Sequence, residues 1–277
     1  MSHPSAPHVA MPAEELRGFE KVAVPLLEAF NASHGFRRAT HIVQGKSFGG
    51  LIHLAFQNLA EPHGLAELAK ANVPHGLIVV SNHRTFYDFF YLGTWITFHT
   101  PHCKEVLFPV RSPFFYTNPV GVALNLVAAG GSMWPPVFRD ERRRSLNPVG
   151  VQQIAKTLAP GVMMGIHPEG TRNRQKDPQS FLPLKPGLGQ LLELVHPEVR
   201  VMPAFIAGHC TDLKRDFTRG FRPRGQRGEP IRLWYGEPRS AGSIVAESTD
   251  PMLRTEIAFA GVRELAEKDR ALHGAGR

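Results

Sequence analysis

Two short apolar runs in this chain each end in a cluster of polar side chains, and this pattern constrains the fold more than any other feature. Residues 76–80 (GLIVV) precede residues 81–88 (SNHRTFYD), and residues 161–166 (GVMMGI) precede residues 167–174 (HPEGTRNR). Short apolar runs bounded by turn residues are typical of buried strands. We therefore expect two strands whose carboxyl ends carry polar, chemically reactive residues.

The first polar cluster contains a histidine and an aspartate five positions apart. His83 falls in the turn after the strand, and Asp88 falls in the first turns of the helix that follows. This separation is not the spacing of one helix face, but a histidine still in the turn can fold back to meet the aspartate. A carboxylate on one imidazole nitrogen fixes the tautomer and leaves the other nitrogen to accept a proton. The pattern therefore predicts a His/Asp general base.

An alternative interpretation of the same octapeptide is an ordinary helix N-terminus. Asn82 would then cap the helix, and Asp88 would favour the helix dipole without any chemical role. The residues alone leave both interpretations open.

The second polar cluster combines a carboxylate, a hydroxyl and a guanidinium in one turn. Pro168 and Gly170 mark the turn, so we expect Glu169, Thr171 and Arg172 to project from a loop at the carboxyl edge of the sheet. Such a set suits a ligand that carries hydroxyls and a phosphate, because Arg offers phosphate a bidentate fork. The alternative is a plain Pro-Glu-Gly turn with solvated arginines.

Strand and helix patterns alternate along the rest of the chain. This alternation predicts an α/β fold with a mixed, mainly parallel sheet flanked by helices, and with an N-terminal helical segment. Further strands are expected at 106–110, 199–206 and 231–235, and helices at 119–128, 147–158 with Asn147 as cap, 186–195 and 250–273.

The expected domain organisation has three parts. Residues 1–11 are predicted to be a disordered leader, residues 12–72 an N-terminal helical segment, and residues 73–277 the α/β domain. The helical segment is expected at 12–32, with a bend at Pro25, and again at 47–59 and 64–71. It would either pack on the main domain or dock on a membrane surface.

The net charge indicates the kind of binding partner, and the cysteine content indicates the cellular compartment. A formal net charge of +8 favours an anionic partner, which includes phosphate, nucleic acid and an acidic membrane surface. Two cysteines without a Cys-x-x-Cys pair argue against a disulfide framework or a thiolate metal site and favour a reducing cytoplasm. We expect no signal peptide at residues 1–7. The longest uncharged stretch, residues 112–138, is too interrupted by Pro and Gly to span a membrane.

Taken together and in their order along the chain, these motifs are similar to those of the glycerolipid acyltransferases, the lysophosphatidic acid acyltransferase family. Residues 82–88 resemble the Asn-His-x-x-x-x-Asp box and residues 168–172 the Pro-Glu-Gly-Thr-Arg box of that family. Residues 137–139 resemble the intervening Ile-Asp-Arg box, residues 184–187 the Phe-Lys-x-Gly box and residues 201–203 the Val-Pro box. Two positions depart from the pattern: Phe138 replaces the middle Asp, and His167 replaces the usual Phe. The resemblance covers roughly residues 76–210.

The resemblance implies an acyl transfer from acyl-CoA or acyl carrier protein, without cofactor or metal, to the hydroxyl of a lysophospholipid such as 1-acylglycerol-3-phosphate. His83 would remove the proton from that hydroxyl, and Asp88 would hold the imidazole. The aromatic residues of 86–98 and the uncharged segment 112–138 would line an acyl groove. The acceptor phosphate and glycerol would be held by Arg139, Glu169, Gly170, Thr171 and Arg172.

Three alternatives stay open beside this reading. The altered middle box keeps another acceptor, glycerol 3-phosphate or a lyso-aminolipid, in consideration. A His/Asp hydrolase or metal site is a second class, but the fourteen histidines include no His-x-x-x-His spacing. A basic module for nucleic acid lacks any zinc-finger or RNA-binding signature. We expect a peripheral protein on the cytoplasmic face of the inner membrane and no nucleic-acid partner.

Overall fold

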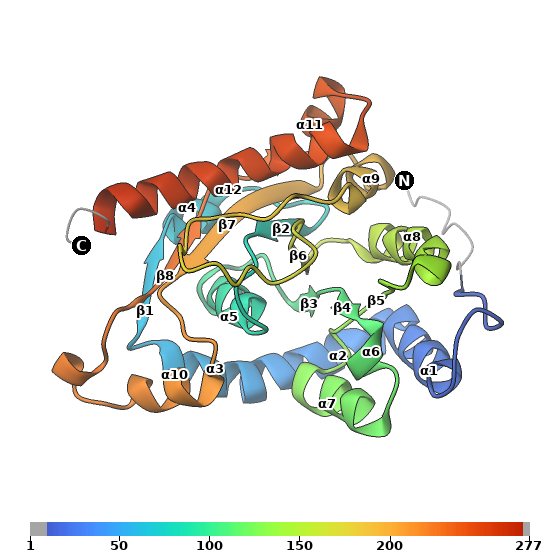
Figure 1. Cartoon of the computed structure of the whole chain (residues 1–277), viewed down its shortest axis with the longest axis horizontal. Coiled ribbons are helices and arrows are strands. Elements are labelled where there is room, and N and C mark those ends of the chain that lie inside the picture. Colours follow the sequence, from blue (N-terminus) through green and yellow to red (C-terminus); the bar gives the residue numbers. More distant parts are fainter. Residues whose placement is uncertain (1–9, 274–277) are drawn as a thin grey trace.

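A seven-stranded sheet forms the centre of the fold in this computed structural model, which describes residues 10–273 except for the side chains of His34 and Leu213. The strand order is β1–β8–β7–β2–β6–β3, with β9 beside β7 (Figure 1). The strands are β1 Ala60–His63, β2 Leu77–Ser81, β3 Glu105–Leu107, β6 Val162–Ile166, β7 Arg200–Ala207, β8 Ile231–Tyr235 and β9 Arg239–Ser240. A separate two-stranded sheet joins β4 Val110–Arg111 to β5 Pro136–Val137.

Most strand pairs of the central sheet are parallel. β2 pairs in parallel with both β6 and β7, β3 with β6 and β1 with β8, whereas β8 and β9 run antiparallel to β7. The prediction of a mixed, mainly parallel sheet is confirmed. Because β7, β2 and β6 are parallel neighbours, their carboxyl ends meet at one edge of the sheet, where ligands bind in folds of this kind.

Helices cover both faces of the sheet (Figure 1). On one face the strands pack against α8, α9, α11 and α12, and on the other against α3, α4 and α5. The helices are α1 Glu20–Ala32, α2 His34–Gln44, α3 Gly50–Phe56, α4 Leu65–Lys70, α5 Asp88–His99, α6 Ser112–Phe115, α7 Pro119–Ala129, α8 Asn147–Thr157, α9 Gly187–Leu194, α10 Leu213–Gly220, α11 Ala241–Glu247 and α12 Pro251–His273. A π-helix, η1 Gly45–Gly49, joins α2 to α3, and two short 3-10 helices are η2 Glu141–Leu146 and η3 Arg224–Gln226.

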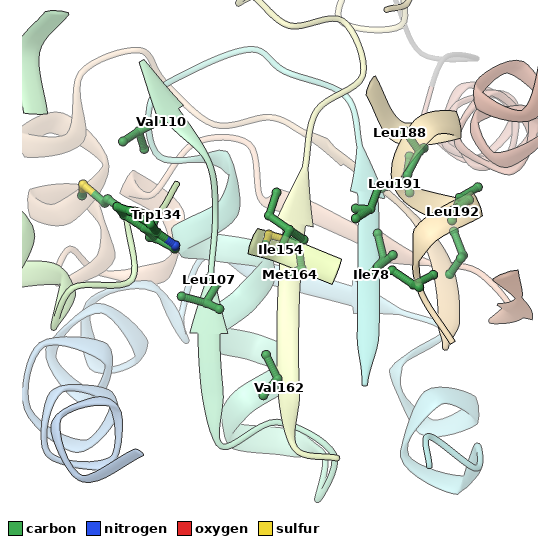
Figure 2. Close-up of a cluster of buried hydrophobic side chains, with 14 of the residues drawn as sticks. Ile78, Leu107, Val110, Trp134, Ile154, Val162, Met164, Leu188, Leu191 and Leu192 are labelled. Atoms are coloured by element: carbon green, nitrogen blue, oxygen red, sulfur yellow. The ribbon is translucent and has the colours of Figure 1, made fainter. Parts of the chain in front are cut away.

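The alternation of side chains along β2 divides the core into two clusters. Ile78 and Val80 face α9 and α12, while Leu77 and Val79 face α3 and α5, and all four are buried. Figure 2 shows part of the first cluster, in which Ile78 is drawn with the α9 residues Leu188, Leu191 and Leu192. A strand buried on both faces reads as a continuous apolar run, which is why residues 76–80 could be recognised from the sequence.

The structure corrects three local predictions. The helical segment expected over residues 12–72 contains β1, a short strand with a proline that pairs at the sheet edge. The strand expected at 106–110 is divided between two sheets, because β3 pairs with β6 and β4 pairs with β5. Asn147 does not cap α8: it is the first helical residue, and its side chain bonds the backbone of Phe138.

Most other features of the N-terminal region follow the prediction. α1, α3 and α4 fall within the stretches expected to be helical, and Pro25 sits inside α1, whereas α2 lies where no helix was expected. Residues 1–9 of the expected leader lie outside the described residues, and Met11 is buried in the core. Within residues 10–273, no helix has both the length and the apolar character needed to cross a membrane.

Candidate active site

The turn between β2 and α5 brings His83 and Asp88 together. His83 Nδ1 lies 2.9 Å from Asp88 Oδ2, and Asp88 is fully buried at the first residue of α5. The turn folds back because the same carboxylate accepts the backbone N–H of Arg84 at 2.6 Å and of Thr85 at 2.9 Å. The prediction that the two side chains meet is confirmed. The carboxylate of Asp88 accepts the backbone N–H groups of the turn and contacts the imidazole of His83 at the same time.

Asn82 has a different role from the helix cap of the alternative interpretation. Its side chain donates to the carbonyl of Ile206 at 2.9 Å and accepts the N–H of the same residue at 3.0 Å. These two bonds join the loop after β2 to the neighbouring strand β7. Asn82 therefore fixes the position of His83 relative to the sheet edge.

A second histidine contacts the buried carboxylate from the opposite side. His209 follows β7, and its Nε2 lies 2.7 Å from Asp88 Oδ1, with the side chain 2% exposed. Burial acts to raise the pKa of Asp88, but the hydrogen bonds from His209 and His83 outweigh it and hold the pKa well below its ordinary value. The hydrogen bonds therefore favour the ionised form of Asp88.

A third histidine stacks on the ring of His83. His167 follows β6, and its ring lies parallel to that of His83 at a centroid distance of 4.2 Å and an interplanar angle of 6°. His167 Nδ1 is 3.0 Å from Ser81 Oγ. Desolvation, followed by the nearby charge of His83, lowers the pKa of His167 to about 3. His167 is thus a neutral ring at physiological pH, and it occupies the position where the related motif carries an aromatic side chain.

Glu169 lies beneath His83 rather than projecting from its loop, which corrects the sequence expectation. It is 1% exposed. Its Oε1 accepts the N–H of His83 at 2.9 Å and its Oε2 accepts the N–H of Leu182 at 2.8 Å. Burial raises the pKa of Glu169, and these two backbone hydrogen bonds oppose the rise. Because both oxygens are used by the backbone, the carboxylate braces the histidine turn.

The other residues of the second polar cluster reach the surface next to an arginine from a distant segment. Gly170, Thr171 and Arg172 are exposed, and the guanidinium of Arg139 donates a hydrogen bond to the carbonyl of Gly170. Burial lowers the pKa of Arg139, and the positive charges of Arg111 and Arg172 lower it further. The structure thus gathers three cationic side chains beside the loop that carries Glu169 and Gly170.

An apolar cavity of about 80 Å³ lies along α5. Phe89 and Phe90, the two residues after Asp88, line it together with Phe98 at the end of α5. The opposite wall comes from η1 and from the first turn of α3. The uncharged segment 112–138, which we expected to line a groove, supplies Ala129 and Ser132.

The donor atoms of His83, Asp88 and His167 lie within 4.8 Å of one another, a spacing compatible with a bound metal ion. However, the Asp88 oxygens already accept hydrogen bonds from His83, His209 and Thr85. A metal ion would have to displace these donors. The arrangement instead suits proton transfer at His83, whose side chain is 21% exposed.

Sequence reasoning missed the contribution of His209, which lies 121 residues from Asp88. The available signal was its position two residues after the apolar strand β7, which matches that of His83 after β2. His167 was noticed only as a departure from a motif. His83, His167 and His209 therefore follow β2, β6 and β7, which are adjacent parallel strands.

Comparisons with known proteins agree with this arrangement at the level of the family. A family model described as Acyltransferase matches residues 63–207, which is more than half of the chain. A solved structure of the 1-acyl-sn-glycerophosphate (LPA) acyltransferase PlsC from Thermotoga maritima is similar, with 19% identity and a TM-score of 0.48 over 94% of this chain and 86% of that chain. No curated protein matches the sequence. Because the family model spans the strands that carry His83, Asp88, His167 and Glu169, the chain belongs to the acyltransferase family.

Proposed function

We propose that this acyltransferase moves a fatty acyl group from the thioester of acyl-CoA or acyl carrier protein to the hydroxyl of a lysophospholipid, with 1-acylglycerol-3-phosphate as the acceptor. The contact of 2.9 Å between His83 Nδ1 and Asp88 Oδ2 carries the proposal. An ionised carboxylate can accept hydrogen bonds but cannot donate them. His83 Nδ1 therefore bears the proton, and Nε2 has the free lone pair. The imidazole is therefore prepared to act as a base.

In the proposed reaction, His83 Nε2 takes the proton from the acceptor hydroxyl as its oxygen attacks the thioester carbonyl. The tetrahedral intermediate then breaks its C–S bond, and the leaving thiolate takes the proton back from the imidazolium. Asp88 stabilises the charged imidazole between these two steps. No enzyme nucleophile is needed, because holding both substrates side by side removes much of the entropic barrier.

The cationic group of Arg111, Arg139 and Arg172 supports a phosphate-bearing acceptor. All three are exposed at one place near His83, and mutual repulsion of their charges is relieved when an anion binds. Thr171 is exposed in the same loop and offers a hydroxyl to the glycerol part. Gly170 contributes its backbone, and Glu169 acts in this proposal by bracing the loop instead of touching the acceptor.

The apolar cavity behind Phe89 and Phe90 supports an acyl chain next to the base. Both residues belong to the first turn of α5, the helix that begins at Asp88, so the cavity and the His83/Asp88 pair share this helix. Burial of each methylene contributes about 0.8 kcal/mol, which makes an apolar cavity the natural place for an acyl chain.

Exposed apolar side chains on the N-terminal helices and α7 support peripheral docking on an anionic membrane at the cytoplasmic face of the inner membrane. These helices lie along one side of the molecule (Figure 1). Val43 is 68% and Val127 80% exposed. The net charge of +8 adds attraction to acidic headgroups, and salt screens that part. The exposed apolar residues are Val22, Leu26, Phe36, Ile42, Val43, Leu51, Leu54, Val120, Leu124 and Val127.

The test uses purified protein with labelled acyl-CoA or acyl carrier protein and a panel of lysolipids, with thiol release and acylated product followed together. We expect equal amounts of thiol and acylated 1-acylglycerol-3-phosphate. If acylated product formed only with glycerol 3-phosphate or only with a lyso-aminolipid, that compound would replace 1-acylglycerol-3-phosphate as the acceptor. Thiol release that continues unchanged without any acceptor would indicate a hydrolase. Flotation with anionic liposomes, compared at low and high salt, tests the docking separately.

A further inference from the structure

Three side chains at the far edge of the sheet converge although they come from opposite ends of the chain. Glu61 and His63 lie on β1, and His273 is the last residue of α12. His63 Nε2 is 3.0 Å and His273 Nε2 is 3.3 Å from the same oxygen, Glu61 Oε1. The donor atoms of all three residues lie within 4.8 Å of one another. None of them belongs to the site around His83.

The strand and the helix impose this convergence. Glu61 and His63 are two positions apart on β1, so their side chains point to the same face of the sheet. The helix α12 runs over that face, and Asp269, one turn before His273, accepts from Arg232 Nε at 2.6 Å and from Trp234 Nε1 at 3.0 Å. These contacts anchor the end of α12 on β8, next to β1.

The ring of His63 is held in place by its neighbour in the sheet. Trp234 on β8 is the register partner of His63, and the two rings stack at a centroid distance of 3.9 Å and an interplanar angle of 15°. Metal-binding imidazoles commonly have their orientation fixed by such surrounding contacts. The His63 nitrogen is therefore presented toward Glu61 and His273 in a defined direction.

A buried nitrogen without a hydrogen bond points to a missing ligand. Within residues 10–273, His273 Nε2 is shielded from solvent and forms no hydrogen bond of good geometry, even though Glu61 Oε1 is close to it. A buried unsatisfied polar atom is costly unless something else binds it. A cation at the centre of the three donors would satisfy this nitrogen, and it would replace the single hydrogen bond between His63 Nε2 and Glu61 Oε1.

We propose that Glu61, His63 and His273 form a zinc site that fastens the end of α12 to the edge strand β1. Two imidazoles and one carboxylate are a common ligand set for Zn²⁺, with a water in the fourth position. With bonds of about 2.0–2.1 Å and tetrahedral angles, neighbouring ligand atoms stand about 3.3 Å apart. The separations of 3.0 and 3.3 Å from Glu61 Oε1 fit this spacing.

The test compares zinc binding by the metal-free full chain and by single-ligand variants. His273→Ala removes one ligand at the helix end, Glu61→Gln removes the carboxylate charge, and His63→Phe keeps an aromatic ring on Trp234 while removing the nitrogen. His102→Ala is the control, because its Nε2 bonds the carbonyl of Leu68 away from the site. Binding is measured by equilibrium dialysis with Zn²⁺ and by the visible absorption of bound Co²⁺.

We expect one tightly bound Zn²⁺ in the parent and in His102→Ala, and a four-coordinate Co²⁺ spectrum. Each ligand variant should bind at least about 10-fold more weakly, since even outer partners of metal ligands matter by 10- to 100-fold. Zinc should raise the unfolding temperature of the parent in a concentration-dependent way and raise that of the ligand variants less at the same zinc concentration. Metal-free unfolding temperatures show whether each variant is folded.

Two results would overturn the proposal. Equal zinc affinity of His273→Ala and the parent would show that these residues do not hold the ion. Zinc binding that survives in His273→Ala but disappears in His83→Ala would place the ion at the histidine site near α5 instead.

Discussion

Asp88 lies between two histidines, with His83 Nδ1 2.9 Å from Oδ2 and His209 Nε2 2.7 Å from Oδ1. The carboxylate also accepts the hydroxyl of Thr85 at 2.7 Å. Every lone-pair direction of a buried carboxylate is thus used, which keeps it ionised and fixes its orientation. His209 does not reach the reacting atoms in this arrangement, so we infer that it positions Asp88 and tempers its negative charge.

The rate should rise with pH as His83 loses its proton, because a base must be neutral to accept one. Replacing His209 by Phe should move this ascending limb of the pH–rate profile to higher pH. Phe fills the space of the ring but gives Asp88 Oδ1 no donor, so the carboxylate attracts a protonated His83 more strongly. The sign is the same whether His209 is neutral or charged, because losing either a hydrogen bond or a positive charge strengthens that attraction. Rates measured with a phosphodiester acceptor avoid titration of the substrate. A loss of rate without any movement of the limb would mean that His209 serves packing alone.

Arg139→Ala and Arg172→Ala should each raise the KM for a phosphate-bearing acceptor and affect the acyl donor less. A lost phosphate contact weakens ground-state and transition-state binding alike. Arg144→Ala is the matched control, since Arg144 lies five residues after Arg139 and its side chain is 63% exposed, beside Glu141. Steady-state kinetics with a phosphate-bearing acceptor and with a neutral monoacylglycerol separate the contributions. Impaired donor binding in both variants, with unchanged acceptor KM, would contradict the acceptor site.

Glu169→Gln should lower the turnover rate because it disturbs the backbone that holds His83. The amide oxygen can still accept one of the two N–H groups now bound by the carboxylate, but the amide nitrogen cannot accept the other. Leaving a buried backbone donor unsatisfied costs about 1–3 kcal/mol, so the unfolding temperature should also fall. Turnover and thermal unfolding are measured on the same preparation. Unchanged values of both would show that the brace is dispensable.

Stability should increase with pH between about 4 and 6.5, partly through His167. Burial lowers its pKa to about 3 in the folded protein, against 6.5 in the unfolded chain. In that window the unfolded chain binds a proton that the folded protein does not, so the free energy of unfolding gains up to about 1.4 kcal/mol per pH unit from this residue. Burial also lowers the pKa of His41 to about 4, so this residue likewise makes the free energy of unfolding increase with pH. His167→Phe should make the slope shallower in chemical denaturation at several pH values, and an unchanged slope would refute the assignment.

Local patterns in the sequence were enough to place the strands of the site but not the contacts between them. The strands in residues 76–80 and 161–166 are buried on both faces, so each is a continuous apolar run that can be identified in the sequence as a strand. β1 was missed because its Ala-Glu-Pro-His sequence is polar and contains proline, as an edge strand tolerates. The orientation of Glu169 could not be predicted, because the N–H groups that turn it inward belong to His83 and Leu182.

Hydrogen bonds to residues outside the local motif explain the other failures. His209 reaches Asp88 across 121 residues, and this depends on β7 pairing with β2, which periodicity does not reveal. Asn147 matched the pattern of a helix cap, but its side chain instead holds the backbone of Phe138, beside Arg139. In each case a tertiary hydrogen bond overrides the local preference of the residue.

Acyl transfer by His83→Ala, measured side by side with the parent protein and Asp88→Asn, tests the central claim most directly. With labelled acyl-CoA and 1-acylglycerol-3-phosphate, we predict that His83→Ala abolishes product formation. Asp88→Asn should lose about 10²-fold or more, by comparison with general-base contributions, and its ascending limb should move to lower pH. Circular dichroism and the unfolding temperature confirm that each variant is folded. A folded His83→Ala protein with near-normal turnover would contradict the account, because the proton would then be removed by another group.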